Sequence, residues 1–186
     1  VKVVIISEKN EYNHLLDEVK SFKPLVIGFS SVSSQFNYVK EMAALIKKLF
    51  PSITIICGGV HPTINTDALL ETEMINGFFV GESEFSIVEF LNKIEKGESF
   101  KEIDNFAYVQ NGVVVRNKLK SLIENLDLLP HPDKEIYPYK KTIMDLGYAP
   151  FFFARGCPYM CTYCSNHALA GLYGRKRNYP RFRSPE

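Results

Sequence analysis

Three cysteines fall within eight positions near the end of the chain and carry its clearest chemistry. Cys157, Cys161 and Cys164 are spaced C-x3-C-x2-C in the segment "RGCPYMCTYCSN", residues 155–166. Thiolates bind soft and borderline metals, and clustered cysteines select zinc or iron–sulfur. A four-coordinate site needs one more ligand. Either His167, three positions after Cys164, completes a Cys3His zinc site, or one coordination position is left open.

Composition favours a folded protein of the reducing cytoplasm. The chain has 186 residues, of which 46% are hydrophobic, and its formal net charge is +1. It is long enough for a sizeable core, and its charge gives no general attraction to nucleic acid or to a membrane. No signal peptide is visible, and no apolar run approaches the roughly 18 residues that span a bilayer. Four cysteines, three of them clustered, indicate a metal site rather than a disulfide framework. Cys57, inside an apolar run, is interpreted as a core thiol.

Alternating apolar runs and helical periodicities indicate how the chain positions this loop. Four short apolar runs predict strands, and the segments between and after them have helical spacing; the strands are expected at 2–6, 25–30, 53–59 and 77–81, and the helices around 12–19, 39–49, 68–74 and 87–94. Gly97 is expected to end the last helix. Strands apolar on both faces and separated by helices predict a parallel sheet covered on both sides, a doubly wound (flavodoxin- or Rossmann-like) α/β domain.

The pattern changes after residue 97. An Asn-Gly pair between two β-rich runs predicts a hairpin over residues 105–117. The proline-containing stretch 126–140 is interpreted as a linker, and "APFFFARG", 149–156, as a buried strand whose carboxyl end leads into the cysteine loop. We therefore expect an α/β domain over 1–97, a hairpin and interdomain linker over 98–148, and the first strand and cluster loop of a truncated barrel domain over 149–186. The start at Val1 and the helix-start signal of the last three residues predict a piece of a longer protein.

The cysteine loop resembles the signature of radical S-adenosylmethionine (SAM) enzymes, including the aromatic Tyr163 just before the last cysteine. The resemblance implies a [4Fe–4S] cluster held by Cys157, Cys161 and Cys164. Its fourth iron is chelated by the amino and carboxylate groups of SAM, which would explain the missing ligand. A reduced cluster then splits SAM into methionine and a 5′-deoxyadenosyl radical. The match to the motif places Tyr163 near the adenine.

The preceding domain resembles the cobalamin-binding domain in front of the catalytic partial TIM-type barrel in one class of radical SAM enzymes. The segments "KPLVIGFSS", "IKKLFPSITIICGGVHPT", "FFVGESEFSIVEFLNKIEKG" and "NLDLLPHPD" carry the likeness over nearly the whole chain. It implies that the cobalamin nucleotide tail is lined by the serine loop and the glycine pair, Ser30, Ser31, Gly58 and Gly59; His61 could approach the cofactor. Taken singly, these residues are better interpreted as caps and turns, and Glu82 and Glu84 as capping acids at a helix start.

Two departures from that family pattern bear on the cofactor. Ser83 stands at the third position of the usual Gly-Glu-Gly-Glu, and the Asp-x-His-x-x-Gly signature, whose histidine binds cobalt, is absent. We therefore expect cobalamin to bind without a histidine ligand from this signature.

The resemblance implies a parent enzyme that abstracts hydrogen from an unreactive carbon, often followed by methyl transfer. Its partners would be an unknown small-molecule substrate and an electron donor such as flavodoxin or ferredoxin. The isolated chain is expected to be inactive, and no catalytic side chain is assigned. Two alternatives stay open: a zinc-stabilised binding module, and a radical SAM enzyme of RNA modification. The only hint of the second is the basic run 174–183, for which a solvated loop or a contact with the SAM carboxylate is preferred.

Overall fold

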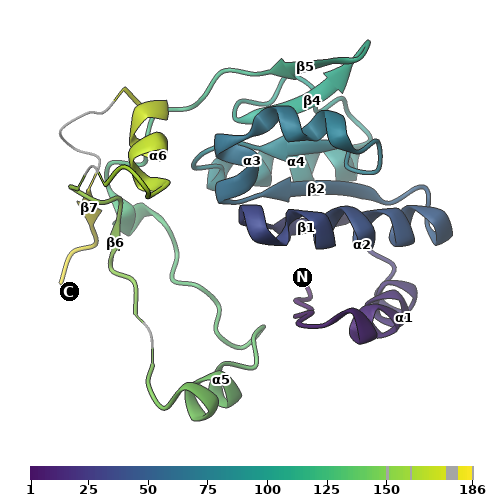
Figure 1. The fold of residues 1–186 in the computed structure, drawn as a ribbon, viewed down its shortest axis with the longest axis horizontal. Coiled ribbons are helices and arrows are strands. Elements are labelled where there is room, and N and C mark those ends of the chain that lie inside the picture. Colours follow the sequence, from purple (N-terminus) through teal and green to yellow (C-terminus); the bar gives the residue numbers. More distant parts are fainter. Residues whose placement is uncertain (150, 160, 175–179, 186) are drawn as a thin grey trace.

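The computed structural model of the chain describes residues 1–149, 151–159, 161–174 and 180–185. Figure 1 shows an α/β body, formed by the first part of the chain, and a C-terminal part made of loops, short helices and two short strands. We refer below to residues 8–116 as the α/β body and to residues 139–185 as the C-terminal part.

A five-stranded mixed sheet in the order β1-β2-β3-β4-β5 forms the centre of the body. The strands are β1 (Val26–Ser30), β2 (Thr54–Gly58), β3 (Gly77–Phe79), β4 (Phe106–Gln110) and β5 (Val113–Arg116). The first three are parallel, whereas β4 is antiparallel to β3 and β5 to β4. The predicted parallel sheet is confirmed for β1–β3. The predicted hairpin is confirmed too, and it extends this same sheet.

The backbone of the hairpin turn explains why its Asn-Gly pair predicts a hairpin. Asn111 and Gly112 both have positive φ, 52° and 75°. This is the geometry of a type I′ turn, whose twist matches that of the flanking strands, and Asn-Gly is the pair that tolerates it best.

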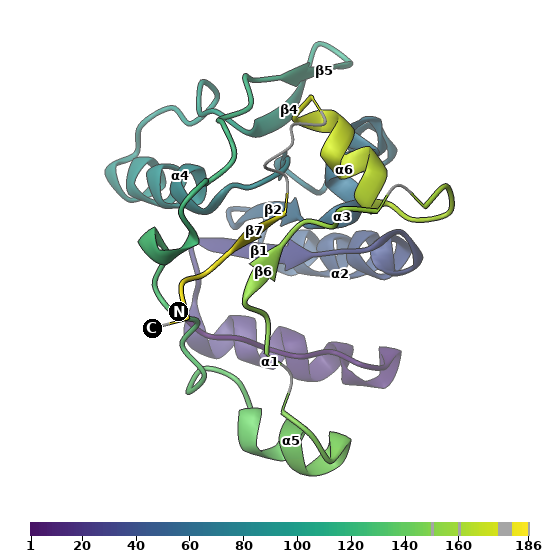
Figure 2. The same cartoon turned by 90° about the vertical axis from the view of Figure 1, so that its left-hand side faces the viewer.

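Helices pack on both faces of the sheet. They are α1 (Tyr12–Phe22), α2 (Phe36–Leu49), α3 (Val60–Ile64) and α4 (Glu84–Lys96), with 3-10 turns at Lys9–Glu11, Ser33–Gln35 and Thr66–Glu71. In Figure 2 α4 lies on one side of the sheet, and α2 and α3 lie on the other. Successive strand residues point to opposite faces. Ile55 and Cys57 accordingly join the hydrophobic cluster of α1 and α2, whereas Ile56 joins the cluster of α4.

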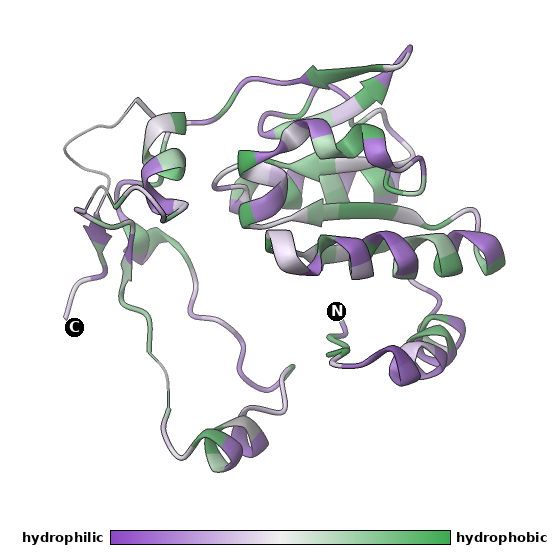
Figure 3. Ribbon diagram, in the orientation of Figure 1, coloured by the Kyte–Doolittle hydropathy of each residue, from purple (hydrophilic) through white to green (hydrophobic). Residues whose placement is uncertain are grey.

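Aromatic rings dominate the α4 cluster. Phe90 and Phe106 are fully buried, and the rings of Phe79, Phe90 and Phe106 have centroids 5.1–5.5 Å apart. Such tilted and edge-on pairs add to the energy of burial itself. Figure 3 shows the resulting pattern, with apolar green along the strands and purple on the outward sides of the helices.

Several predicted helical details change in the structure. The expected helix over 68–74 is a 3-10 turn over Thr66–Glu71, and α3 was not anticipated. On α4 the apolar residues Val88 and Leu91 are 56% and 42% exposed, whereas Phe90 is fully buried. A broad apolar stripe does not reveal which of its edges meets the sheet. The end of α4 at Gly97 is confirmed, with φ of 69°.

The predicted strand over residues 2–6 is wrong. Residues 1–7 form neither helix nor strand, and no described strand pairs with them. Backbone groups of a strand need a neighbouring ladder, which apolar side chains alone do not provide. Val4 and Ile6 still pack against the cluster of α1 and α2.

The C-terminal part has little core of its own. Its elements are α5 (Tyr139–Leu146), β6 (Ala154–Arg155), α6 (Asn166–Leu172) and β7 (Arg181–Phe182), preceded by a 3-10 turn at Leu126–Leu128. Among its described residues, only Ala170 and Arg181 are buried. Residue 150 of the predicted buried strand over 149–156 lies outside the described residues, and among the others only Ala154–Arg155 form a strand. Phe151, Phe152 and Phe153 are 65–90% exposed, and only β6 pairs, antiparallel to β7.

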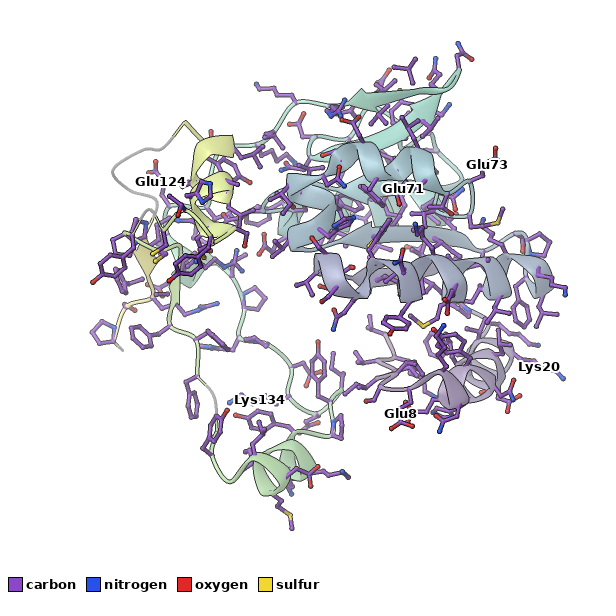
Figure 4. All side chains as sticks on the ribbon, viewed as in Figure 1. Glu8, Lys20, Glu71, Glu73, Glu124 and Lys134 are labelled. Carbon is purple, nitrogen blue, oxygen red and sulfur yellow. The ribbon has the colours of Figure 1, made fainter. Side chains whose placement is uncertain are left out.

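Polar contacts and contacts of cations with aromatic rings stabilise the C-terminal part instead of a core. Figure 4 places Glu124 beside the C-terminal elements and Lys134 close to α5. The Lys134 ammonium lies 4.8 Å from the ring centroid of Tyr139 and 4.9 Å from that of Phe151. This one cation thus joins the segments on both sides of α5.

Candidate functional site

The carboxyl ends of β1 and β2 are bound together by backbone hydrogen bonds. Ser31 N–H donates to the Gly58 carbonyl at 3.0 Å, and His61 N–H donates to the Ser31 carbonyl at 3.0 Å. Ser31 is buried and its hydroxyl donates to the Val32 carbonyl at 2.9 Å, whereas Ser30 is exposed. The two serines thus differ: Ser31 shapes the loop, and Ser30 presents its side chain at the surface.

The two glycines of the pair also differ. Gly59 has φ of 97°, and a Cβ there would lie 2.8 Å and 2.9 Å from backbone atoms of Ser31. Gly59 is therefore required by the close approach of the two loops, rather than by space for a ligand. A Cβ on Gly58 would meet only Phe79, at an ordinary 3.8 Å.

A strip of small residues runs along β1 and β2 on the α4 side of the sheet. Gly28 lies opposite Ile56 and Ser30 lies opposite Gly58 in the parallel register. Gly28 and Ser30 are exposed, and a Cβ on Gly28 would contact nothing closer than the Ile56 side chain at 3.7 Å. The sheet backbone is thus accessible here, and a flat group can lie directly against it.

His61 lies in α3, directly after the glycine pair. Its Nδ1 lies 3.0 Å from the Ser33 hydroxyl, its ring centroid lies 4.4 Å from that of Phe36, and the residue is 8% exposed. Its Nε2 has no hydrogen-bond partner among the described residues. Burial lowers the pKa of His61, so the imidazole is neutral at pH 7.

Thr63 links the end of β2 to the end of β3, a role that sequence reasoning missed. Its hydroxyl donates to the Gly59 carbonyl at 2.8 Å and accepts from Gly81 N–H at 3.0 Å. The sequence did contain a signal, because Thr63 closes the "CGGVHPT" segment. All three parallel strands therefore end in one connected set of loops, where ligands of doubly wound sheets bind.

The acids after β3 are arranged differently from the prediction. The N-cap of α4 is Ser83 and Glu84 occupies its first turn, as expected for an acid near a helix start. Glu82 precedes the cap, and its carboxylate binds Arg181 of the C-terminal part. The interpretation of Glu82 as a simple capping acid is therefore wrong.

The cysteine loop lies between β6 and α6. Cys157 and Cys164 are half-buried, Cys161 is exposed, and all three are free thiols. Cys164 N–H donates to the Cys161 carbonyl at 3.1 Å, so the second and third cysteines share one turn. Within the described ranges, which omit residue 160, no three His, Cys, Asp or Glu side chains are already gathered as a metal site.

The aromatic and histidine neighbours of the loop have distinct positions. Tyr163 is 91% exposed. The Nδ1 atom of His167, in the first turn of α6, contacts the Cys164 carbonyl. The loop thus offers three thiols, a free aromatic ring and a histidine engaged through one ring nitrogen.

Comparisons with known proteins identify the domain first. Residues 1–91 match the B12 binding domain family. This match agrees with the three parallel strands and their connected carboxyl-end loops.

The relatives then point to a wider class. The chain is 25% identical over 178 residues to an uncharacterized methyltransferase, PH0819, of Pyrococcus horikoshii, covering 95% of this chain and 39% of that protein. It is 27% identical over 157 residues to the anaerobic magnesium-protoporphyrin IX monomethyl ester cyclase of Rubrivivax gelatinosus, covering 80% and 28%. The chain therefore spans well under half the length of these relatives.

A solved structure shares the fold. The cobalamin-dependent SAM radical enzyme OxsB, solved with aqua-cobalamin and SAM bound, superposes with a TM-score of 0.68 at 22% identity, covering 82% of this chain and 21% of that one. The predicted resemblance to radical SAM enzymes that contain a B12-binding domain is thereby confirmed. Among the described residues, no helix combines the length and apolar character that crossing a membrane requires.

Proposed function

We propose that this chain is the cobalamin-binding and cluster-binding part of a radical SAM enzyme. The observation that carries the proposal is the presence, in one chain, of a B12-binding domain and a C-x3-C-x2-C loop of free thiols. Three thiolates on one loop suit a [4Fe–4S] cluster with one iron open for SAM. The whole protein would act on an unreactive carbon, and the names of the relatives favour methyl transfer or ring closure.

The residues at the strand ends fit a cobalamin tail. The accessible backbone beside Gly28 and Gly58 is a surface on which the flat base of the nucleotide can lie. Ser30 offers an exposed hydroxyl at the rim, while Ser31 and Gly59 fix the loop shape behind it. His61 is buried and neutral with one ring nitrogen unpartnered among the described residues, so it can supply a hydrogen bond without adding charge.

The cysteine loop fits the cluster through its donor set. Cys157, Cys161 and Cys164 would each bind one iron, and Tyr163 would lie against the adenine of SAM. When bound, the cluster supplies the electron that cleaves the C–S bond of SAM. The exposure of Cys161 and Tyr163 leaves this side of the loop open to SAM and to an electron donor such as flavodoxin or ferredoxin.

Anaerobic reconstitution with iron, sulfide and hydroxocobalamin tests the proposal. We expect about four irons per chain with a broad visible band near roughly 400 nm, and one bound corrinoid. One zinc per chain and no visible band would reject the radical SAM assignment. Failure to bind the corrinoid would reject the cobalamin site alone.

A zinc-stabilised binding module is the second candidate, favoured by the proximity of His167 to the loop. The variant His167→Ala separates the two candidates. It should abolish a Cys3His zinc site, because that site needs all four ligands. It should leave a three-thiolate cluster essentially intact, since the His167 ring is hydrogen-bonded to the Cys164 carbonyl, a backbone atom that the cluster does not need as a ligand.

RNA modification has weaker support. The basic run 174–183 falls partly on residues 175–179, which lie outside the described residues. Arg183 donates to the Leu129 carbonyl at 3.0 Å. Arg181 is only 6% exposed and donates to the Glu82 carboxylate. The prediction of a solvated loop is therefore wrong for Arg181. These two cations are engaged within the chain, so a small-molecule substrate remains the preferred proposal.

A further inference from the structure

The carboxylate of Glu82 is the meeting point of three separate segments. Both of its oxygens accept from Arg181, at 2.8 Å and 2.5 Å, and one also accepts from Ile123 N–H at 3.0 Å. Arg155 lies 3.5 Å from the other oxygen and 2.5 Å from Glu84. The Glu82 side chain is only 15% exposed and that of Arg181 only 6%, so this two-pronged ion pair is shielded from water.

The backbone at the same position holds a fourth segment. Glu82 N–H donates to the Tyr173 hydroxyl at 2.7 Å. The ring rests on Gly81, where a Cβ would lie 2.0 Å from the hydroxyl oxygen and 3.0 Å from the ring carbon next to it. Gly81 has φ of 72°, so a glycine is required both by the backbone and by the ring.

These attachments flank the cysteine loop in sequence. Arg155 ends β6, two residues before Cys157, and Arg181 is its direct partner on β7. Tyr173 caps the end of α6, the helix that follows the loop. Glu82 itself stands between β3 and α4, among the connected strand-end loops of the B12-binding domain. The dipeptide Gly81-Glu82 of the body therefore contacts the chain both before and after the cysteine loop.

We propose that Glu82 is a positioning residue that fixes the cysteine loop at a set place on the carboxyl end of the B12-binding sheet. The inference rests on the proposed function and adds a geometry to it. A cofactor at the sheet end and a cluster on the loop would be held at a fixed distance from each other. Among the described residues of the C-terminal part, Ala170 is the only buried apolar one, so polar contacts must supply this order. Arg155 and Arg181 compensate the buried charge of Glu82, which would otherwise be costly.

Native-state hydrogen exchange on the cofactor-free 186-residue chain tests the inference. In Glu82→Gln, which removes the charge at nearly constant volume, peptides covering 154–159, 165–173 and 181–185 should exchange about tenfold faster or more, which corresponds to about 1.4 kcal/mol of local stability. Peptides from β1 and β2 should exchange unchanged. Glu89→Gln is the matched control, because Glu89 makes an exposed contact with Lys120 at 3.4 Å and touches no loop attachment.

Two outcomes would overturn the inference: unchanged exchange around the loop, or equal acceleration throughout the sheet, which would make Glu82 a residue of general stability. If Glu82→Gln does not fold, Tyr173→Phe tests the other attachment at this position, the one made by the Glu82 backbone. It keeps the ring on Gly81 and removes only the hydroxyl that accepts from Glu82, so the exchange of 165–173 should still rise.

A spectroscopic readout separates positioning from local stability. In the chain loaded with cob(II)alamin and a reduced cluster, the magnetic coupling between the two centres should change in Glu82→Gln at equal iron and corrinoid content, and should not change in Glu89→Gln. Identical coupling in all three proteins would overturn the positioning role. A wild-type chain that binds neither centre would instead reject the proposed function, and the exchange experiment would still decide the attachment.

Discussion

The α/β body is stabilised by one kind of contact and the C-terminal part by another. In the body, two hydrophobic clusters lie on opposite faces of one sheet, and residues such as Phe90 and Phe106 are fully buried. In the C-terminal part, Phe151 to Phe153 are largely exposed, and β6 and β7 are two residues each. Its order comes from ion pairs and hydrogen bonds to the body, above all at Glu82.

The comparison shows how one chain can hold a rigid site next to an adaptable one. Apolar burial is non-directional and fixes the sheet ends without help from a ligand. A few polar contacts fix the flanks of the loop on which we propose that a metal cluster binds.

Loss of a loop cysteine should abolish cluster binding, while loss of the body cysteine should not. Cys157→Ala, Cys161→Ala and Cys164→Ala should each lower the iron content after anaerobic reconstitution from about four per chain to near zero, because each thiolate holds one iron. Cys57→Ala is the control. Cys57 is fully buried and its pKa is raised to about 12 by burial, so it is no thiolate ligand. Loss of iron in Cys57→Ala would contradict the division of roles.

Removing an aromatic ring should destabilise the body far more than the C-terminal part. Phe90→Ala should lower the free energy of unfolding by about 3–5 kcal/mol, because it leaves a cavity among Phe79, Phe100 and Phe106. Phe152→Ala, at a residue 90% exposed, should change it by less than about 0.5 kcal/mol. Urea unfolding followed by far-ultraviolet circular dichroism measures both. Similar losses would mean that the C-terminal aromatic residues are buried in solution.

The glycine pair should respond unequally to substitution. Gly59→Val should destabilise the body by about 1–3 kcal/mol, because a side chain at φ of 97° is strained and collides with the Ser31 backbone. By displacing the Ser30–Ser31 loop it should also weaken hydroxocobalamin binding by about tenfold or more, measured by spectral titration. Gly58→Ala is the control, since its Cβ makes only ordinary contacts with Phe79. Unchanged corrinoid affinity in a folded Gly59→Val variant would show that these loops do not form the cobalamin site.

Acid should loosen the attachment between the two parts through Glu82. Burial raises the pKa of Glu82, but hydrogen bonds from Arg181 and Ile123 N–H and the charges of Arg181 and Arg155 outweigh it, so the net pKa is lowered from 4.5. Because the folded pKa is the lower one, the stabilisation is complete above pH 4.5 and is lost as the pH falls through the folded value. NMR titration of the Glu82 amide and the Arg181 guanidinium should show a midpoint below 4.5. A midpoint at or above 4.5 would show that the ion pair is not formed in solution.

Elements with a local signal were predicted well. The strands near 25–30, 53–59 and 77–81, the Asn111-Gly112 hairpin and the helix end at Gly97 each follow from short-range preferences for burial periodicity or positive φ. The segments at 2–6 and 149–156 carry the same apolar signal, yet among their described residues only Ala154–Arg155 form a strand. A strand depends on a partner from elsewhere in the chain, and its own residues do not reveal whether that partner is present.

The chemistry that this chain can offer follows from its residue types and their spacing alone. Thiol spacing and the order of the serine loop, the glycine pair and the acidic turn are local properties, and the resemblance they carry agrees with the B12 binding domain family match. The contacts between distant residues become visible only in the folded chain. Gly59 makes room for the Ser31 backbone, Thr63 joins two strand ends, and Glu82 binds Arg181, 99 residues away. Spacing along the chain encodes neighbours in a turn, whereas charge pairing and close approach across the fold depend on how the sheet brings distant segments together.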